Sequence, residues 1–202
     1  MEVTFMIKNI IFDLGNVLIS FHPEKFTEEN VEEKYRKDFY NLVFGGKHWQ
    51  DLDRGTLEYE DAVEYFSSQL PQCKDAIKKL FDRKIIDCLS PIKENVEIMK
   101  SLKGKYNLYI LSNFHYPAFE NIYNNWEFFK TFDGKIVSGF HKLLKPEKEI
   151  YELLLNTYSL KPEECLFIDD VKVNIEGAER CGINAVQLIS PELLKDVVKK
   201  YL

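Results

Sequence analysis

Short apolar runs alternate with amphipathic segments along most of the chain. Five runs have the length of buried strands and end at polar or turn residues, namely residues 10–12, 106–111, 135–138, 165–168 and 185–188. Segments with apolar residues at helical spacing separate most of these runs, as in residues 148–158. Strands separated by helices of this length indicate right-handed βαβ crossovers. We therefore predict an α/β fold with a parallel, Rossmann-like sheet flanked by helices.

Punctuating residues predict where several of the helices begin and end. Ser90 followed by Pro91 favours a helix start, and this helix is expected to run to about Leu102. Gly182 favours the end of a helix over residues 173–181, because glycine is the preferred residue just past a helix. A second Ser-Pro pair at residues 190–191 predicts the start of the last helix.

The segment after the first strand shows only helical patterns. Residues 28–44 carry apolar side chains at helical spacing up to a break at Gly45–Gly46. Thr56 is expected to cap a further helix, and residues 76–86 form another amphipathic piece. We therefore predict a small α-helical domain over residues 22–85, inserted into a core domain that is formed by residues 1–21 and 86–202.

Polar side chains gather where the predicted strands end. Carboxyl ends of parallel strands meet at one edge of a sheet, and open α/β sheets bind ligands there. An Asx turn or a helix cap explains one aspartate in such a place, but several coincidences at one edge indicate a site. The residues at this edge are Asp13, Ser112, Asn113, Lys145, Asp169 and Asp170.

These residue types form a chemically coherent set. The carboxylates of Asp13, Asp169 and Asp170 are hard oxygen ligands, which suit Mg²⁺ rather than zinc or copper. Ser112, Asn113 and Lys145 are hydrogen-bond donors of the kind that hold phosphoryl oxygens. A carboxylate that faces a metal-bound phosphoryl group can attack it in line and form an aspartyl-phosphate.

Four motifs resemble those of the haloacid dehalogenase superfamily in order and spacing. They are Asp13-Leu14-Gly15-Asn16-Val17, Leu111-Ser112-Asn113, Lys145-Pro146, and Phe167-Ile168-Asp169-Asp170 with Asn174 and Gly177-Ala178. The resemblance covers the predicted core, and the helical insertion lies where that family carries a small cap domain. The chain is most similar to the subgroup of sugar-phosphate phosphatases that includes α-D-glucose 1-phosphate phosphatase. The phosphatase domain of soluble epoxide hydrolase is similar as well.

The resemblance implies a role for each motif residue. Asp13 would be the nucleophile and a Mg²⁺ ligand, and Gly15 would offer the metal its backbone carbonyl. Asp170 would bind the metal directly, with Asp169 as a further ligand or an outer-sphere partner. The residues implied to hold the phosphoryl group are Ser112 and Lys145, with Asn113 beside them, and Asn174 would orient the acidic loop. The implied activity is a Mg²⁺-dependent phosphatase that acts on a small sugar phosphate such as glucose 1-phosphate.

Gly15 departs from the family pattern in a way that affects the chemistry. Most phosphatases of the superfamily carry a second aspartate here, which acts as general acid and base. General acid catalysis contributes roughly 10²–10⁴-fold, so its loss is felt most with poor leaving groups. We therefore expect a substrate with a comparatively good leaving group, such as an anomeric sugar phosphate, or one that supplies its own proton through a neighbouring hydroxyl. The plainer interpretation is that Gly15 only supplies a sharp turn.

Two other functions fit parts of the pattern. A 2-haloacid dehalogenase also lacks the second aspartate, although the Asp169–Asp170 pair argues against this metal-independent chemistry. A non-catalytic or regulatory phosphate-binding module would keep the same site without turnover. Both alternatives make different predictions for Mg²⁺-dependent phosphate release by the wild type and by Asp13→Asn.

Turns of the helical insertion are the segments most able to reach the site. Trp49 is a candidate to stack on a sugar ring, and Arg54 or His48 to hydrogen-bond its hydroxyls. The pattern favours the plainer interpretation for each, namely packing between helices for Trp49 and a solvent-exposed turn residue for Arg54. His115 follows the Ser112–Asn113 motif closely, but the pattern favours a surface-loop histidine.

Composition narrows the partners and the compartment. The formal net charge of −6 argues against nucleic acid and anionic membranes as partners, and favours a small phosphorylated metabolite held by a local cationic group. Four widely spaced cysteines fit neither a zinc site nor a disulfide framework. No basic leader segment precedes the first apolar run, so we expect a reduced, cytoplasmic compartment. The pattern carries no signal for the oligomeric state.

Overall fold

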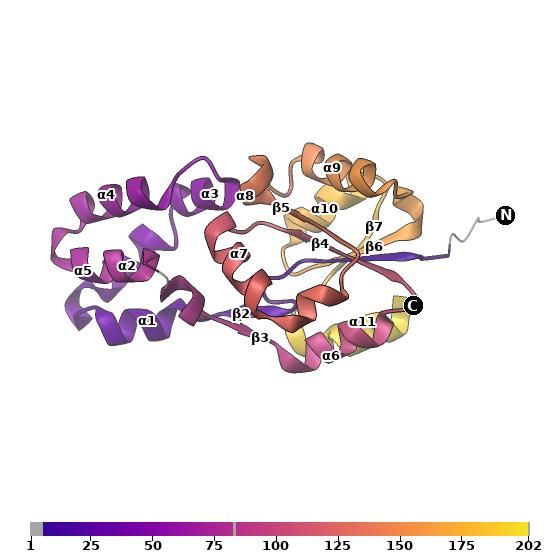
Figure 1. Cartoon of the computed structure of the whole chain (residues 1–202), viewed down its shortest axis with the longest axis horizontal. Helices are drawn as coiled ribbons and strands as arrows, with labels where there is room; N and C mark the ends of the chain where they lie inside the picture. The colour runs from indigo at the N-terminus through magenta and orange to yellow at the C-terminus, as the bar shows by residue number, and fades with distance from the viewer. Residues whose placement is uncertain (1–5, 83, 202) are drawn as a thin grey trace.

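A computed structural model describes residues 6–82 and 84–201 of the chain. Its centre is a five-stranded sheet in which all neighbours are parallel, in the order β5–β4–β1–β6–β7 (Figure 1). The strands are β1 (Asn9–Phe12), β4 (Asn107–Ser112), β5 (Gly134–Val137), β6 (Cys165–Asp169) and β7 (Asn184–Gln187). The predicted parallel α/β fold is confirmed.

Helices cover both faces of this sheet. The helices that pack on one face are α6 (Lys93–Leu102), α7 (Tyr116–Asn125) and α11 (Leu194–Tyr201), while α9 (Lys148–Tyr158) and α10 (Lys172–Arg180) pack on the other. Short 3₁₀ turns are η3 (Glu127–Thr131), η4 (Pro162–Glu164) and η5 (Pro191–Leu193), and α8 (Ser138–His141) is a single helical turn. Figure 1 shows the two helical layers above and below the strands.

The central strand β1 is buried along its whole length. Its neighbouring side chains alternate between the two layers: Ile10 and Phe12 pack into one hydrophobic core, and Ile11 into the other. This alternation follows from the period of two in a strand, and burial on both faces explains why the run is almost continuously apolar. The carboxyl ends of β1, β4 and β6 are therefore firmly placed, and Asp13, Ser112 and Asp169 lie at these ends.

A second body of helices lies between β2 (Ile19–Phe21) and β3 (Leu89–Pro91), which pair antiparallel. We call residues 22–88, of which residue 83 lies outside the described part, the insert. Its helices are α1 (Pro23–Asn30), α2 (Glu33–Val43), α3 (Lys47–Arg54), α4 (Tyr59–Gln69), α5 (Lys74–Phe81), η1 (Pro71–Cys73) and η2 (Lys84–Cys88). They surround a further hydrophobic core, to which Ala118 of α7 also belongs, at the left of Figure 1.

Several predicted boundaries were wrong in this region. Residues 28–44 form two helices, because Val31 leaves the helical conformation with extended φ and ψ angles. Thr56 caps no helix, since its hydroxyl donates back to the carbonyl of Asp51. The Ser90–Pro91 pair lies in β3 rather than at a helix start, and α6 begins only at Lys93.

The insert contacts the core through helices α3 and α8. Gly55 closes α3 in a left-handed conformation with φ of 75°. A Cβ atom on Gly55 would lie 2.1 Å from the carbonyl oxygen of Gly139 in α8, so only glycine permits this approach. The hydroxyl of Ser138 donates a hydrogen bond to the carbonyl oxygen of Asp53 at the same contact. These contacts therefore hold the C-terminal end of α3 against α8, which directly follows β5.

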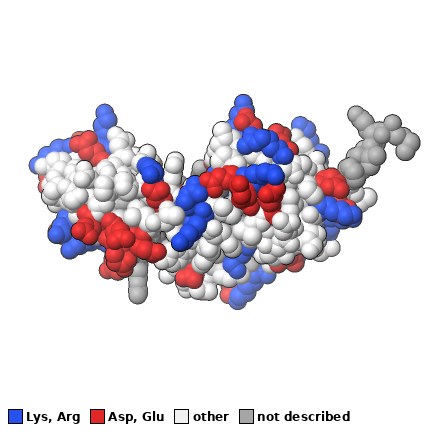
Figure 2. Space-filling view, turned by 90° about the horizontal axis from the view of Figure 1, so that it is seen from above, with Lys and Arg blue, Asp and Glu red and all other residues white. Residues whose placement is uncertain are grey.

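The surface carries charged groups of both signs. On the face in Figure 2, lysine and arginine side chains are interspersed with aspartate and glutamate. The four cysteines are free thiols. Within residues 6–82 and 84–201, no helix has the length and apolar character needed to cross a membrane.

Candidate active site

Asp13 lies where β1 ends, at the edge of the sheet that the sequence singles out. Its backbone amide still donates to the carbonyl of Ile168 in β6, at 2.9 Å, which fixes the start of the following turn. The side chain is buried, and burial raises the pKa of its carboxyl to about 6 against the opposing attraction of Lys145. The Asp13 carboxyl therefore lies at the end of the sheet, directly after the last residue of β1.

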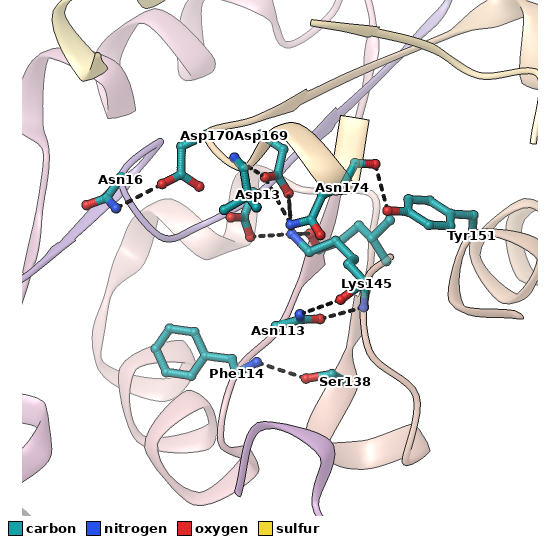
Figure 3. A network of polar contacts seen from close by, with 12 residues as sticks. Asp13, Asn16, Asn113, Phe114, Ser138, Lys145, Tyr151, Asp169, Asp170 and Asn174 are labelled. Atoms are coloured by element: carbon teal, nitrogen blue, oxygen red, sulfur yellow. Dashed lines mark hydrogen bonds and ion pairs between the residues drawn. The ribbon is translucent and has the colours of Figure 1, made fainter. Parts of the chain in front are cut away.

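Lys145 joins two carboxylates from different strands. Its Nζ atom lies 2.8 Å from Oδ1 of Asp13 and 2.6 Å from Oδ2 of Asp169 (Figure 3). It also donates to the carbonyl of Leu111 at 3.0 Å. Burial opposes the charge of this ammonium group, but the two carboxylates outweigh burial and raise the pKa of Lys145. The lysine therefore remains protonated inside the site.

Asn113 positions the backbone of Lys145. Its amide oxygen accepts from the Lys145 amide at 2.9 Å, and its amide nitrogen donates to the Lys145 carbonyl at 3.1 Å. These reciprocal bonds use both polar ends of the side chain (Figure 3). Asn113 also lines the pocket, so it contributes to the shape of the site as well as to the placement of the lysine.

Ser112 is the last residue of β4 and lies in the same cluster. Its hydroxyl oxygen is buried, and no described residue gives it a hydrogen bond of good geometry, although the hydroxyl favours the charged form of Asp13 and so lowers its pKa. Buried hydroxyls of native proteins are nearly always paired, so an unpaired one at a functional edge indicates a missing ligand oxygen. The Ser112 hydroxyl can therefore donate to a ligand oxygen at this edge of the sheet.

Asp169 and Asp170 differ in how much of each carboxylate is already used. The two Asp169 oxygens accept from the backbone amide of Val171 and from the ammonium of Lys145. The side-chain amide nitrogen of Asn174 donates to both of them. Asp170 accepts one side-chain bond, at 2.9 Å, from Asn16. Burial raises the pKa of Asp170, which is the expected result for a carboxyl that lacks a strong cationic partner.

Asn174 holds the acidic loop from helix α10. Its amide nitrogen lies 3.1 Å from each Asp169 oxygen, and its backbone carbonyl accepts from the hydroxyl of Tyr151 on α9 at 2.8 Å. Tyr151 is fully buried, so this chain of bonds ties the loop to the core. The side chain of Asn174 is therefore fixed against both oxygens of Asp169.

The donor set fits a hard divalent cation. One oxygen from each of Asp13, Asp169 and Asp170 lies within 4.8 Å of the others. Three carboxylates face the single ammonium of Lys145, so negative charge is left without a partner. All side-chain ligands of the cluster are oxygens, which favours Mg²⁺ over softer metals.

Gly15 is not required by the backbone of the turn. Its φ angle lies outside the positive range, and a Cβ atom built on it would come no closer than 4.0 Å to Oδ2 of Asp13. The positive φ of the turn belongs to Asn16, at 52°. The interpretation of Gly15 as turn punctuation is therefore not supported, because a side chain would fit there.

A pocket of about 200 Å³ opens from Asp13 toward the insert. Its polar residues are Asp13, Gly15, Asn16, Asp53, Asn113 and His115, and its apolar residues are Ile19, Phe21, Trp49, Ile85, Leu89, Phe114 and Ala118. Both the core and the insert thus contribute to one wall. Trp49 lines it while packing on Phe21, with ring centroids 5.5 Å apart. Trp49 therefore packs against a neighbouring ring and also lines the pocket.

Two insert residues named as candidates lie elsewhere. Arg54 forms a bidentate ion pair with Glu147 of the core and is not part of the pocket wall. His48 stacks on Tyr65 with ring centroids 3.7 Å apart, within the insert. The structure thus brings together the motif residues of the core and Trp49, but neither Arg54 nor His48.

Two residues of the pocket, His115 and Asp53, were not predicted from the sequence. His115 is 2% exposed, so the expected surface-loop histidine was wrong. Its Nε2 lies 3.2 Å from Oδ1 of Asp53, and its Nδ1 lies 3.3 Å from the hydroxyl of Tyr59. Asp53 stands beside Arg54 in the turn that was expected to reach the site. The position of His115 only three residues after Ser112 was a sign that it lies in the site. The local sequence gave no reason to choose Asp53 over Arg54 as the residue that reaches the pocket.

Known proteins resemble this chain in sequence. A family model described as haloacid dehalogenase-like hydrolase matches residues 7–182. Sesquiterpene phosphatase astK of Aspergillus oryzae is 26% identical over 90% of this chain and 89% of its own length. The phosphorylated carbohydrates phosphatase of Thermotoga maritima is 26% identical over 96% of this chain and 99% of its own.

Solved structures share the fold. A HAD family enzyme of Bacteroides thetaiotaomicron, bt-2542, crystallised with magnesium and inorganic phosphate, superposes with a TM-score of 0.71 at 21% identity. The superposition covers 90% of this chain and 93% of the other.

Proposed function

This chain belongs to the haloacid dehalogenase-like hydrolases and is a phosphatase of that family, and we propose that Asp13 is its nucleophile. The observation that carries the proposal is the Asp13–Lys145–Asp169 arrangement, with contacts of 2.8 and 2.6 Å beside an unpaired Ser112 hydroxyl. The substrate would be a phosphomonoester, and the intermediate an aspartyl-phosphate on Asp13.

The cofactor is Mg²⁺, which suits the all-oxygen cluster. We assign the direct ligands to Asp13, the carbonyl of Gly15 and Asp170. Asp169 would stand behind them, because Val171, Asn174 and Lys145 already occupy its oxygens. The cation, when bound, neutralises charge on the phosphoryl oxygens and lets an anionic substrate approach anionic Asp13.

The remaining motif residues would hold the phosphoryl group in line with Asp13. The Lys145 ammonium neutralises oxygens that gain charge during transfer, and the Ser112 hydroxyl donates to one of them. Asn113 keeps the lysine backbone in place through its two reciprocal bonds. Each of these groups is set before substrate arrives, so little reorganisation accompanies the reaction.

The pocket supports a small metabolite as substrate. Its volume of about 200 Å³ is below the roughly 300–1,000 Å³ of pockets for drug-sized ligands. A sugar phosphate such as glucose 1-phosphate is the class that we favour, with the sugar ring against Trp49. This size argues for a carbohydrate over a long isoprenoid chain, although one similar protein is a sesquiterpene phosphatase.

The insert would act as a cap over this pocket. We divide the chain into a core domain of residues 1–21 and 86–202 and a cap domain of residues 22–85. Cap residues Trp49 and Asp53 line the same pocket as Asp13. A cap in this place excludes water and selects the leaving group.

A metabolite screen with and without Mg²⁺ tests the proposed function. Wild type is expected to release phosphate from sugar phosphates only with Mg²⁺, and Asp13→Asn is expected to release none. Phosphate binding without turnover would favour a non-catalytic module. Metal-independent chloride release from a 2-haloacid would favour dehalogenation, and either result would overturn the proposal.

A further inference from the structure

We propose that Asp53, from helix α3 of the insert, is the general acid and base that Gly15 does not supply. This inference rests on the proposed function, because it concerns the second half of the same reaction. It is a further catalytic residue, contributed by the insert rather than by the sheet edge. It also widens the substrate class to phosphomonoesters with poor leaving groups.

The pocket offers few groups for this role. Among its lining residues, only Asp13 and Asp53 carry carboxyl groups, and Asp13 is assigned to attack phosphorus. Lys145 is held between two carboxylates and does not line this pocket. His115 is neutral, because burial lowers the pKa of its imidazole to about 3. Elimination leaves Asp53.

Neighbouring side chains enclose the Asp53 carboxyl. Burial raises the pKa of Tyr59, so its phenol keeps the proton, and its hydroxyl is hydrogen-bonded to Nδ1 of His115 at 3.3 Å. Nε2 of the same imidazole lies 3.2 Å from Oδ1 of Asp53, a contact that lacks the geometry of a hydrogen bond. The neutral imidazole therefore lies against the Asp53 carboxyl without taking its proton.

The electrostatic surroundings suit an acid at neutral pH. Burial raises the pKa of Asp53 to about 8, the nearby charge of Asp13 adds to the rise, and Lys145 opposes it. The Asp53 side chain keeps 19% of its surface exposed, so it can still reach a ligand in the pocket. General acids work best with a pKa near the working pH.

Contacts beside Asp53 hold it to the core. The Asp53 carbonyl accepts from Ser138, and the next residue, Arg54, is paired with Glu147. Gly55 then lies against Gly139 with no room for a side chain. Three consecutive positions of the insert are thus docked at the mouth of the site. A catalytic group on an insert needs such a fixed place.

The proposed steps balance in atoms and electrons. An Asp13 oxygen forms a bond to phosphorus while the bond from phosphorus to the leaving oxygen breaks. That oxygen keeps the electron pair and takes the proton of Asp53, which gives an alcohol, an aspartyl-phosphate and an Asp53 carboxylate. Asp53 then takes a proton from water as the water oxygen attacks phosphorus. The bond between Asp13 and phosphorus breaks, inorganic phosphate leaves, and both side chains return to their first state.

A leaving-group series measures this role directly. We would compare kcat/KM of wild type and Asp53→Asn on p-nitrophenyl, trifluoroethyl and ethyl phosphate with saturating Mg²⁺. kcat/KM reports the transfer to Asp13, in which the acid protonates the leaving oxygen. The variant is expected to lose about 10²–10⁴-fold on ethyl phosphate and less than about tenfold on p-nitrophenyl phosphate. Asp51→Asn, which removes a carboxylate from the same helix outside the pocket wall, is expected to match wild type.

Other outcomes separate this inference from the proposed function. An equal loss of kcat/KM on all three esters, or no loss, would overturn the acid role while leaving Asp13 as nucleophile. Wild type inactive on every ester would overturn the proposed function, and this inference with it. Asp53→Glu is a second probe, because it keeps a carboxyl group: we expect a leaving-group dependence like that of wild type even at a lower rate. A dependence as steep as that of Asp53→Asn would contradict the proposal.

Discussion

Arg54 of the insert and Glu147 of the core form a bidentate ion pair, with Nη1 3.0 Å from Oε2. The same Glu147 oxygen accepts from the backbone amide of Leu144 at 3.0 Å, next to Lys145. Arg54 follows Asp53 directly. One carboxylate thus links the loop that carries the site lysine to the helix that carries the proposed acid.

Replacing Arg54 with methionine is expected to harm activity more than stability. The two side chains are 30% and 35% exposed, and such pairs contribute only about 0.2–1 kcal/mol to the free energy of unfolding. Small displacements of a catalytic group cost much more, so we expect kcat/KM to fall between about 10- and 100-fold. Lys100→Met, which removes the exposed Lys100–Glu97 pair within α6, is the control. A large loss in the free energy of unfolding of Arg54→Met with an unchanged kcat/KM would contradict this role.

Magnesium is expected to stabilise the wild type through Asp170. A cation that binds only the folded state, at 100 times its dissociation constant, adds about 2.7 kcal/mol to the free energy of unfolding. Asp170→Asn should lose most of this gain, measured by thermal unfolding with and without Mg²⁺. Glu176→Gln removes an exposed carboxylate on α10 and should keep the gain. Equal stabilisation of all three proteins would exclude Asp170 as a ligand.

Asp53 also predicts a pH dependence of stability in the metal-free protein. Its pKa is raised from 3.8 to about 8, so the folded state keeps a proton that the unfolded state has lost between these values. The stabilising contribution is complete below pH 4 and is lost as the pH rises to about 8. Asp53→Asn does not titrate and should gain stability relative to wild type across this window. Denaturant unfolding at several pH values in EDTA measures it, and a constant difference would contradict the raised pKa.

Gly15→Asp should be tolerated by the fold and should replace the proposed acid in part. The position has no positive φ angle, and its Cβ would meet only Oδ2 of Asp13, at 4.0 Å. In an Asp53→Asn background, the added carboxyl is expected to restore hydrolysis of ethyl phosphate at least about tenfold, a part of the contribution of a general acid. Gly15→Asn in the same background is the matched control without an acid. Equal rates for the two double variants would show that no acid function was regained.

The core of the site follows from the sequence because its geometry is set by local rules. Parallel strands bring their carboxyl ends to one edge, so Asp13, Ser112 and Asp169 had to lie near one another once the apolar runs were assigned. The lysine was predicted with them, since its loop precedes a clear amphipathic helix. These predictions needed no knowledge of how distant segments pack.

The insert could not be placed in the same way. The approach of Gly55 to Gly139 and the Arg54–Glu147 pair join segments more than 80 residues apart, and no local pattern encodes such contacts. The three-residue strands β2 and β3 contain serine and proline, so their pairing is tertiary rather than a matter of propensity. Asp53 and His115 become site residues only through this docking, which explains why they were missed.

The most direct test of the account is to trap the phosphorylated enzyme. Wild type mixed with Mg²⁺ and a sugar phosphate, then quenched in acid within one turnover, is digested and examined by mass spectrometry. We predict one added phosphoryl group on the peptide that contains Asp13, formed and lost at rates that match turnover and absent from Asp13→Asn. Phosphate release at the normal rate with no phosphorylated peptide, or with the group on another residue, would contradict the central claim.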